Sequence, residues 1–292
     1  MPTVSNGPVD IYYETFGDPG DPTLVLINGL GSQCIHFDAE FCQLLVDHSL
    51  HVVRFDNRDV GLSTKFDRFP PDVFGVIDAL AMGRDPQVAY TLSDMASDVV
   101  ALLDALAVDR AHVAGWSLGG MIAQQMAIDH RERMWSLICV MSTTGDRDVG
   151  QASSEVAEIV LGPSDIDRES IIAKRQQLER IIASPGHFDA LRVARQTGEA
   201  YDRCFNLAGA ARQLCAVLAS PSRSAALRDV RMPSLVLHGD SDRFIDVSGG
   251  VRTADCLEAS RLEVIEAMGH DLSPVFWERI ITLIVEHVNG VN

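Results

Sequence analysis

The chain has 292 residues, and a chain of that length buries about three quarters of its unfolded surface, so a core needs no disulfide or metal. Hydrophobic residues make up 47% and charged residues 22%, values typical of folded globular proteins rather than of disordered chains. The net charge of −17 disfavours nucleic acid and anionic membranes as partners, because both repel an acidic surface.

The cysteines are scattered along the chain without a Cys-x-x-Cys pair, a distribution typical of neither a zinc site nor a disulfide framework. We expect reduced, mostly buried thiols, no metal site and no cofactor. No apolar run approaches the roughly 18 residues of a membrane span, and the N-terminal residues lack the pattern of a secretion signal. The expected location is cytoplasmic, and the sequence leaves the oligomeric state open.

Short apolar runs bounded by turn residues recur along the chain, and segments with helical spacing separate them. The first predicted strand, at 11–16, alternates in polarity and ends at a cluster of Gly, Asp and Pro. Continuous apolar runs are typical of strands buried on both faces, and they occur at 23–27, 51–55, 111–114, 135–141, 234–237 and 262–265.

The clearest predicted helix covers 91–107, where Thr91 and Asp94 have the spacing of an N-terminal capping box. Strands that alternate with helices predict an α/β fold with a mostly parallel, doubly wound sheet and helices on both faces. Such sheets bind ligands beyond the carboxyl ends of their strands. Between 147 and 230 only helical patterns occur, so we predict a core domain at 1–146 and 231–292 with a helical lid at 147–230.

Residues 115–119 read Gly-Trp-Ser-Leu-Gly and lie between a predicted buried strand and a predicted helix. Gly-x-Ser-x-Gly also occurs by chance, as an ordinary glycine-rich turn. In this context it has the arrangement of a nucleophile elbow, a tight turn that exposes the serine oxygen and leaves room only for glycine on either side. We therefore predict that Ser117 is a nucleophile.

A serine hydroxyl needs a base to activate it, and the base needs an acid to orient it. Asp242 follows the strand predicted at 234–237, and His270 follows the strand predicted at 262–265. Both side chains are therefore expected in loops at the carboxyl ends of strands. The predicted catalytic residues are Ser117, His270 and Asp242.

Other aspartates and histidines compete for these roles. Asp146 and Asp148 follow the strand predicted at 135–141 and are alternative acids, whereas Asp240 is expected to hydrogen-bond its own loop. His238 is expected to anchor that loop. The remaining histidines have no partner motif and are expected to be solvated or structurally hydrogen-bonded: His36, His48, His51, His112, His130, His187 and His287.

At these residues the chain resembles a serine hydrolase of the α/β-hydrolase family, over roughly 9–145 and 231–290. Asn-Gly-Leu-Gly at 28–31 stands in the place of that family's oxyanion loop, and the order of the predicted triad along the chain is the family's order. The resemblance implies that the oxyanion hole consists of the backbone N–H groups of Leu30 and Leu118. Donors of this type stabilise the transition state by about 3 to 4 kcal/mol each.

Two positions depart from the family pattern. Asn28 replaces a histidine, but its amide can still donate a hydrogen bond, so we expect the loop to persist. Asp59 replaces a glycine, which predicts a local pairing with Arg58. Asp56 and Arg58 are expected to form a structural pair. More narrowly, 54–63, 212–227 and 268–272 resemble the aclacinomycin methylesterase group, which cleaves an ester on a bulky polyketide.

A serine nucleophile favours acyl transfer, because an alkyl-serine ether could not be hydrolysed. We predict an esterase or lactonase that cleaves a hydrophobic, bulky small-molecule ester or lactone through an acyl-enzyme. Its pocket is expected to include Gly29 and Trp116, although Trp116 is equally suited to the core. Carbon–carbon bond hydrolysis, cofactor-free perhydrolase chemistry and a non-turnover small-molecule receptor are the alternatives. Multiple turnover would distinguish an enzyme from a receptor.

Overall fold

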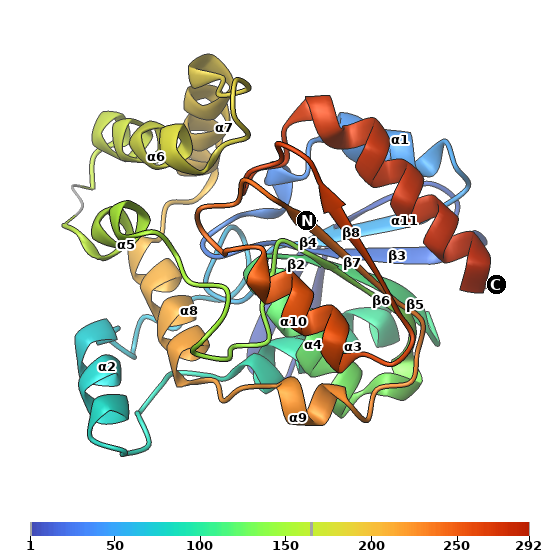
Figure 1. Ribbon diagram of the computed structural model, residues 1–292, viewed down its shortest axis with the longest axis horizontal. Coiled ribbons are helices and arrows are strands. Elements are labelled where there is room, and N and C mark those ends of the chain that lie inside the picture. The colour runs from blue at the N-terminus through green and yellow to red at the C-terminus, as the bar shows by residue number, and fades with distance from the viewer. Residues whose placement is uncertain (1, 164–165, 292) are drawn as a thin grey trace.

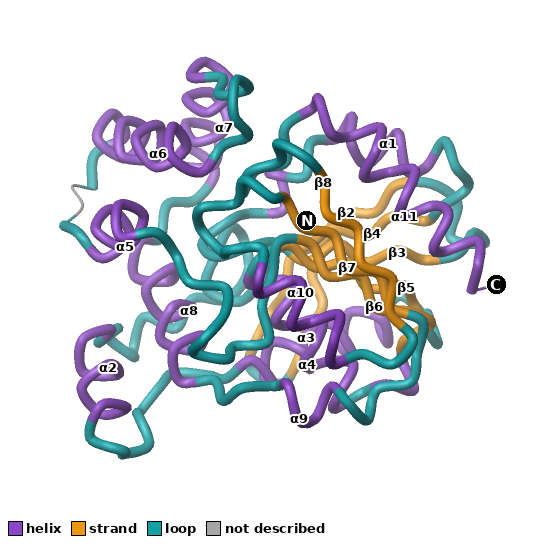
Figure 2. The backbone as a smooth tube through the Cα atoms, in the orientation of Figure 1, coloured by secondary structure: helices purple, strands orange, loops and turns teal. Residues whose placement is uncertain are grey.

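The computed structural model describes residues 2–163 and 166–291, so Met1 and Asn292, the outermost positions of the predicted core domain, lie outside the described residues. The described residues form one sheet of eight strands in the order β1-β2-β4-β3-β5-β6-β7-β8. Figure 2 shows its strands in orange, packed together among the helices. The strands are β1 Thr3–Asn6, β2 Val9–Phe16, β3 Thr23–Ile27, β4 His51–Phe55, β5 Ala111–Trp116, β6 Met134–Val140, β7 Ser234–Gly239 and β8 Ser260–Ile265.

Strands β3 to β8 run parallel, so the predicted mostly parallel sheet is confirmed. β1 and β2 form an antiparallel extension at one edge, and β1 was not expected from the sequence. β8 is the strand at the opposite edge, and its residue Val264 is 47% exposed. The prediction that this run is buried on both faces is therefore wrong, because an apolar run does not reveal whether a strand has a neighbour on each side.

Helices cover both faces of the sheet, as the strand–helix alternation predicts. Figure 1 shows α1 (Ala39–Val46) and α11 (Trp277–Val291) on one face, with α3 (Leu92–Ala105), α4 (Leu118–Asp129) and α10 (Ser248–Cys256) on the other. The buried apolar side chains accordingly form two large clusters, one with α3 and α4 and one with α1 and α11. The predicted capping box of α3 is present, since Thr91 and Asp94 bond each other's backbone N–H groups.

A long helical segment separates β6 from β7, and we call residues 147–230 the helical insertion. Its described residues contain helices and no strand, which confirms the helical pattern predicted there. These helices are α5 Ser154–Leu161, α6 Arg168–Ile182, α7 Ala190–Arg203, α8 Leu207–Ala219 and α9 Ser224–Leu227; short 3-10 helices lie at Cys34–His36, Arg131–Arg133 and Pro274–Phe276. Figure 1 shows α5 to α8 gathered to one side of the sheet, on the side of α2 (Val73–Ala81), while α9 lies by α4 and α10.

Buried ion pairs attach the insertion to the sheet. Arg212 on α8 pairs with Asp59 at 2.8 Å, and both side chains are almost completely buried. Arg203 on α7 pairs at 2.8 Å with Asp56, whose side chain is fully buried. A buried carboxylate requires a charged partner, so these contacts neutralise two core aspartates with residues of the insertion.

The local pairings expected from the sequence do not form. Arg58 pairs instead with Asp98 of α3 at 2.7 Å, so neither Asp56 nor Asp59 contacts it as an ion pair. Asp59 keeps the turn that the family builds with glycine, since its φ is +75°, a left-handed conformation that aspartate tolerates better than most residues. Its carboxylate points to Arg212, because the side chain of Arg58 is bound to α3.

The cysteines are free thiols, as expected. Five are buried and Cys204 is partly exposed. Burial raises the pKa of the Cys139 thiol to about 12, so it is protonated and unreactive at neutral pH. Within the described residues, no helix combines the length and apolar character needed to cross a membrane. The cytoplasmic location stays a prediction.

Candidate active site

Ser117 lies in the turn between β5 and α4, with φ 56° and ψ −117°, a conformation that residues other than glycine seldom adopt. The turn is very tight. A Cβ on Gly115 would lie 2.0 Å from the carbonyl oxygen of Gly119, and a Cβ on Gly119 would lie 2.0 Å from that of Ile27. Only glycine therefore fits on either side of the serine. The local geometry is that of the elbow expected from the sequence, with the Ser117 side chain lining a cavity.

His270 connects Ser117 to Asp242. Its Nε2 lies 3.0 Å from Ser117 Oγ, and its Nδ1 lies 2.7 Å from Asp242 Oδ2, both hydrogen-bond distances. An ionised carboxylate can only accept, so Nδ1 carries the proton in this arrangement and Nε2 is free to accept the serine proton. The structure thus brings the three residues of the predicted triad into one hydrogen-bonded chain.

Asp242 is held as a carboxylate. Its Oδ1 accepts hydrogen bonds of 2.8 Å from the backbone N–H groups of Phe244 and Ile245. Burial opposes ionisation of this side chain, but the charge of His270 and the hydrogen bonds from His238 and His270 outweigh it and hold the pKa of Asp242 well below its usual range. The group nearest to His270 Nδ1 therefore remains negative at neutral pH.

The loop around Asp242 also contributes an aromatic contact that the sequence analysis missed. The ring of Phe244 stacks on the imidazole of His270, with ring centres 4.8 Å apart. His238 bonds the carbonyl oxygen of Ile245 at 2.8 Å, so it anchors this loop as expected. An aromatic residue two positions after the candidate acid was the available sequence signal for Phe244.

The alternative acids have other partners. Asp146 accepts hydrogen bonds from Thr144 at 3.0 Å and from Ser222 and Ser224 of the insertion. These hydrogen bonds outweigh desolvation and lower the pKa of Asp146 to about 2. Together with Asp148, Asp146 pairs with Arg252.

Asp240, the other aspartate near the candidate acid, bonds within its own region. Its Oδ1 accepts the backbone N–H of Ala267 at 2.8 Å and the hydroxyl of Ser241 at 2.9 Å. This local use of its carboxylate agrees with the expected loop role. Neither Asp240 nor the alternative acids make the contact that Asp242 makes with His270.

The loop after β3 lies beside Ser117. A Cβ built on Gly29 would lie 3.4 Å from Ser117 Cβ, and Leu30 lines the same cavity as the serine. The Asn28 amide donates to the carbonyl of Gln33 at 3.0 Å, so the loop is supported by the hydrogen bond expected of that residue. Leu118 opens α4, where the first backbone N–H groups of a helix have no acceptor within the helix.

Two adjoining cavities open at this site. The larger, of about 650 Å³, contains Ser117 and His270 together with both predicted pocket residues, Gly29 and Trp116. The smaller, of about 300 Å³, lies between the loop after β3 and the insertion. The residues that line both cavities are Leu30, Ser32, His36, Arg175, Thr197 and Phe244.

Trp116 serves both roles considered for it. Its side chain is 5% exposed and packs edge to face on Phe37 and Phe41, so most of it belongs to the core. It also forms part of the wall of the larger cavity.

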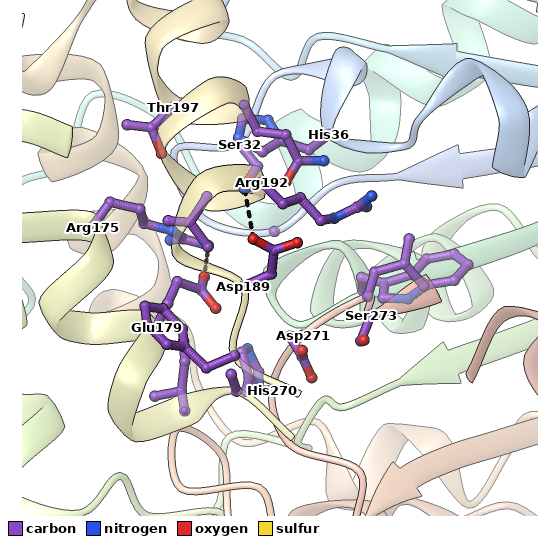
Figure 3. Close-up of a pocket in the computed structure, with 18 of the residues that line it drawn as sticks. Ser32, His36, Arg175, Glu179, Asp189, Arg192, Thr197, His270, Asp271 and Ser273 are labelled. Carbon is purple, nitrogen blue, oxygen red and sulfur yellow. Dashed lines mark hydrogen bonds and ion pairs between the residues drawn. The ribbon is translucent and has the colours of Figure 1, made fainter. Parts of the chain in front are cut away.

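Charged residues of the insertion surround the larger cavity, and the sequence analysis did not identify them. Figure 3 shows Arg175, Glu179 and Arg192, from α6 and α7, around the same space as His36 and His270. Arg175 is paired with Glu179 at 2.5 Å. Burial, with a smaller effect of Arg175, lowers the pKa of His36 to about 4, so that histidine is neutral at neutral pH. No motif marks these residues, because helical spacing of charges also describes a solvated helix face.

Within the described residues, no group of three or more His, Cys, Asp or Glu side chains is arranged to hold a metal ion. The side chains that converge on Ser117 are instead the partners of a hydrogen-bonded nucleophile. Such a site can transfer an acyl group with protein groups alone.

Comparisons with known proteins are in line with this geometry. The family described as alpha/beta hydrolase fold matches residues 22–275. The rhodomycin D methylesterase of Streptomyces peucetius is 26% identical, with 99% of each chain covered, which confirms the predicted resemblance to a methylesterase group. The 3-oxoadipate enol-lactonase 2 of Acinetobacter baylyi is 25% identical, over 91% of this chain and 88% of its own. A meta-cleavage product hydrolase from Pseudomonas fluorescens shares the fold, with a TM-score of 0.78, 19% identity and coverage of 100% and 98%.

Proposed function

Because the chain belongs to the alpha/beta hydrolase fold family, we propose that it is a carboxylic ester hydrolase, an esterase or lactonase with Ser117 as nucleophile. The observation that carries the proposal is the hydrogen-bonded chain from Ser117 through His270 to Asp242. Two relatives that match over most of their length, a methylesterase and an enol-lactonase by name, support the same class of reaction.

In the proposed mechanism, His270 Nε2 takes the proton of Ser117 Oγ as that oxygen attacks the carbonyl carbon of the ester. Asp242 stabilises the imidazolium that forms and keeps its ring oriented. The negative oxygen of the tetrahedral intermediate is bound by the backbone N–H groups of Leu30 and Leu118. His270 then gives its proton to the leaving alcohol, and water, activated in the same way, hydrolyses the acyl-enzyme.

We propose that the substrate is a bulky, mostly hydrophobic ester or lactone. The two adjoining cavities, of about 650 and 300 Å³, are in the range of sites that hold drug-sized molecules. The smaller cavity is lined mainly by apolar side chains, with Ile159, Val160 and Leu178 from the insertion among them. The relatives named as rhodomycin D methylesterases support a methyl ester, which has a small leaving alcohol.

The helical insertion is proposed to act as a lid that sets substrate size. Helices α6 and α7 supply Arg175, Glu179 and Arg192 to the wall of the larger cavity, opposite the loops of the sheet. A substrate would be held between these helices and Ser117. Its apolar part would displace water from the smaller cavity, a favourable transfer of about 25 cal/mol per Å² of apolar surface.

A hydrolysis screen tests the proposal. The panel contains methyl esters of polycyclic aromatic acids, methyl esters of short acids and simple and macrocyclic lactones, assayed with wild type and with Ser117→Ala. Multiple turnovers that require Ser117, with the highest kcat/KM for a bulky member, are the expected result. Turnover should persist after dialysis against EDTA. A stoichiometric burst without turnover would favour a receptor, and activity restored only by added zinc or manganese would contradict the proposal.

A further inference from the structure

The loop that carries His270 is bonded to the end of α6 in the helical insertion. The backbone N–H of His270 donates to the carbonyl oxygen of Ile182 at 2.7 Å. The backbone N–H of the preceding Gly269 donates to Ser184 Oγ at 2.9 Å. Ile182 is the last residue of α6, and Ser184 lies two positions beyond it. Two consecutive N–H groups at the candidate base therefore depend on acceptors from the insertion.

The residue after the histidine extends this contact. Asp271 Oδ1 accepts a hydrogen bond from Ser184 Oγ at 2.5 Å and another from the Ser184 backbone N–H at 3.1 Å. Ser184 is 1% exposed, so its hydroxyl cannot exchange these partners for bulk water. One serine thus bonds the residues on both sides of His270. We call these contacts among Gly269, Asp271 and Ser184 the latch.

The two segments pack too closely for a side chain at Gly269. A Cβ there would lie 2.3 Å from the carbonyl oxygen of Ile182, 2.6 Å from Ala183 C and 2.6 Å from Ser184 N. These are backbone atoms, which cannot move aside as the tip of a side chain can. The contact between the His270 loop and the insertion is therefore backbone against backbone, and small changes in either segment are transmitted to the other.

The core holds the same loop from its other side. Ser241 N–H donates to the carbonyl of Met268 at 3.1 Å, and Ala267 N–H donates to Asp240 at 2.8 Å. These contacts end at Met268, whereas the latch begins at Gly269. The core also holds the loop beyond the histidine, since Trp277 Nε1 of α11 donates to the carbonyl of Leu272 at 3.1 Å. The backbone N–H groups of Gly269 and His270 themselves are bonded by the insertion.

We propose that Ser184 and Asp271 are positioning residues that hold His270 at its distance from Ser117. This inference rests on the proposed function, since it assigns to the latch a role in the reaction of that site. The insertion then does more than cover substrate: it fixes part of the catalytic geometry. A misplacement of a reacting group by about 1 Å can lower a rate about 100-fold.

The test compares steady-state kinetics, on an ester from the screen, of the variants Ser184→Ala, Ser184→Thr, Asp271→Ala and Asp271→Asn. Ser154→Ala, at an exposed serine of the same insertion, is the matched control. Ser184→Ala and Asp271→Ala are expected to lower kcat by about 10- to 100-fold with KM changed by less than about threefold. Ser184→Thr keeps the hydroxyl and should retain most of the wild-type kcat.

Asp271→Asn separates position from charge. Asparagine keeps an oxygen that accepts from Ser184, so kcat at neutral pH should stay within about threefold of wild type. The lost negative charge disfavours the imidazolium of His270, so the acid limb of the profile of kcat/KM against pH should move to lower pH. The low-field NMR signal of the proton between His270 and Asp242 should remain in Asp271→Asn and broaden or shift in Ser184→Ala. A purely structural role would lower Tm in these variants without these changes.

The inference is overturned if folded Ser184→Ala has a kcat within about twofold of Ser154→Ala, or if Asp271→Asn leaves the pH profile unmoved. If Ser184→Ala does not fold, Ser184→Thr and Asp271→Asn decide the question, because both preserve the bonded geometry. The variant Ser117→Ala distinguishes failure of the latch proposal from failure of the proposed function. Loss of turnover in Ser117→Ala beside an active Ser184→Ala rejects only the latch, whereas turnover in Ser117→Ala rejects the proposed function.

Discussion

The sheet and the helical insertion contribute differently to the candidate site. The sheet supplies Ser117, Asp242 and His270, each from a loop at the carboxyl end of a strand. The insertion supplies no member of that hydrogen-bonded chain, but it forms much of the wall of both cavities and bonds the backbone of His270. Under the proposed function, the sheet loops supply the reactive groups, while the insertion shapes the cavities and holds the backbone of His270.

The largest effect is expected at Ser117, the proposed nucleophile, which lies in a loop of the sheet. Ser117→Ala removes the attacking oxygen and should lower kcat by about 10⁴- to 10⁶-fold, as in other serine hydrolases. The fold should persist, because one oxygen at a partly exposed turn is lost. Initial-rate assays on a responsive ester measure this, with Tm as the check on folding. More than about 1% residual activity would show that another group attacks.

The second largest effect distinguishes two loops of the sheet. Asp242→Asn should lower kcat by up to about 10⁴-fold, because an amide stabilises the wrong tautomer of His270 and removes the charge that stabilises the imidazolium. Asp146→Asn should cost far less, since Asp146 bonds Thr144, two serines of the insertion and Arg252. Both variants are assayed side by side on one ester. A nearly active Asp242→Asn beside an inactive Asp146→Asn would place the acid on the loop after β6.

The sheet and the three residues of the hydrogen-bonded chain could be predicted because their signals are local. A buried strand followed by Gly-x-Ser-x-Gly needs only ten residues of sequence, and Asp242 and His270 each follow an apolar run directly. The parallel sheet then brings these loops to one edge without further information. Strand β1 was missed altogether, whereas the prediction for β8 failed on burial rather than on existence, because burial depends on neighbours elsewhere in the chain.

The contacts of the insertion could not be predicted, because each joins residues far apart in sequence. Arg212 lies 153 positions after Asp59, and Ser184 lies 87 positions before Asp271. Spacing suggested that Arg58 would pair locally, yet Asp98 on α3 takes it. The partner of a buried charge is selected by packing, for which a single sequence contains no local signal.

A smaller effect, on stability, tests how firmly the insertion is attached to the sheet. Arg212→Met leaves Asp59 buried without its partner and should lower the free energy of unfolding by about 3 to 5 kcal/mol. Arg231→Met is the matched control: its pair with Glu258 is exposed, so the change should stay below about 1 kcal/mol. Urea unfolding measures both. Equal effects would mean that the buried pair adds nothing beyond a surface contact.

The smallest expected effect is on the pH dependence of stability, and it contrasts the two carboxyl groups beside His270. Asp242 lies in a loop of the sheet, and Asp271 belongs to the latch. Burial acts to raise the pKa of Asp242, but the charge of His270 and the hydrogen bonds from His238 and His270 outweigh it and lower that pKa. Burial, reinforced by the charge of Glu179, raises the pKa of Asp271 above its ordinary value of 3.8. Folding therefore releases a proton from Asp242 at acid pH but favours a proton on Asp271.

These opposite directions give opposite dependences of stability on pH. The contribution of Asp242 is complete above its ordinary pKa of about 4 and is lost as the pH falls toward its folded pKa. The contribution of Asp271 is complete below about 4 and is lost as the pH rises through its folded pKa. The Tm of Asp242→Asn should therefore fall further below that of wild type as the pH rises through this acid range. The Tm of Asp271→Asn should instead rise relative to that of wild type over the same range. Melting curves at intervals between about pH 3 and 7 measure both differences. If the two differences instead change in the same direction with pH, Ser184 stabilises the ionised form of Asp271. The folded protein would then favour the carboxylate of Asp271 as it favours that of Asp242.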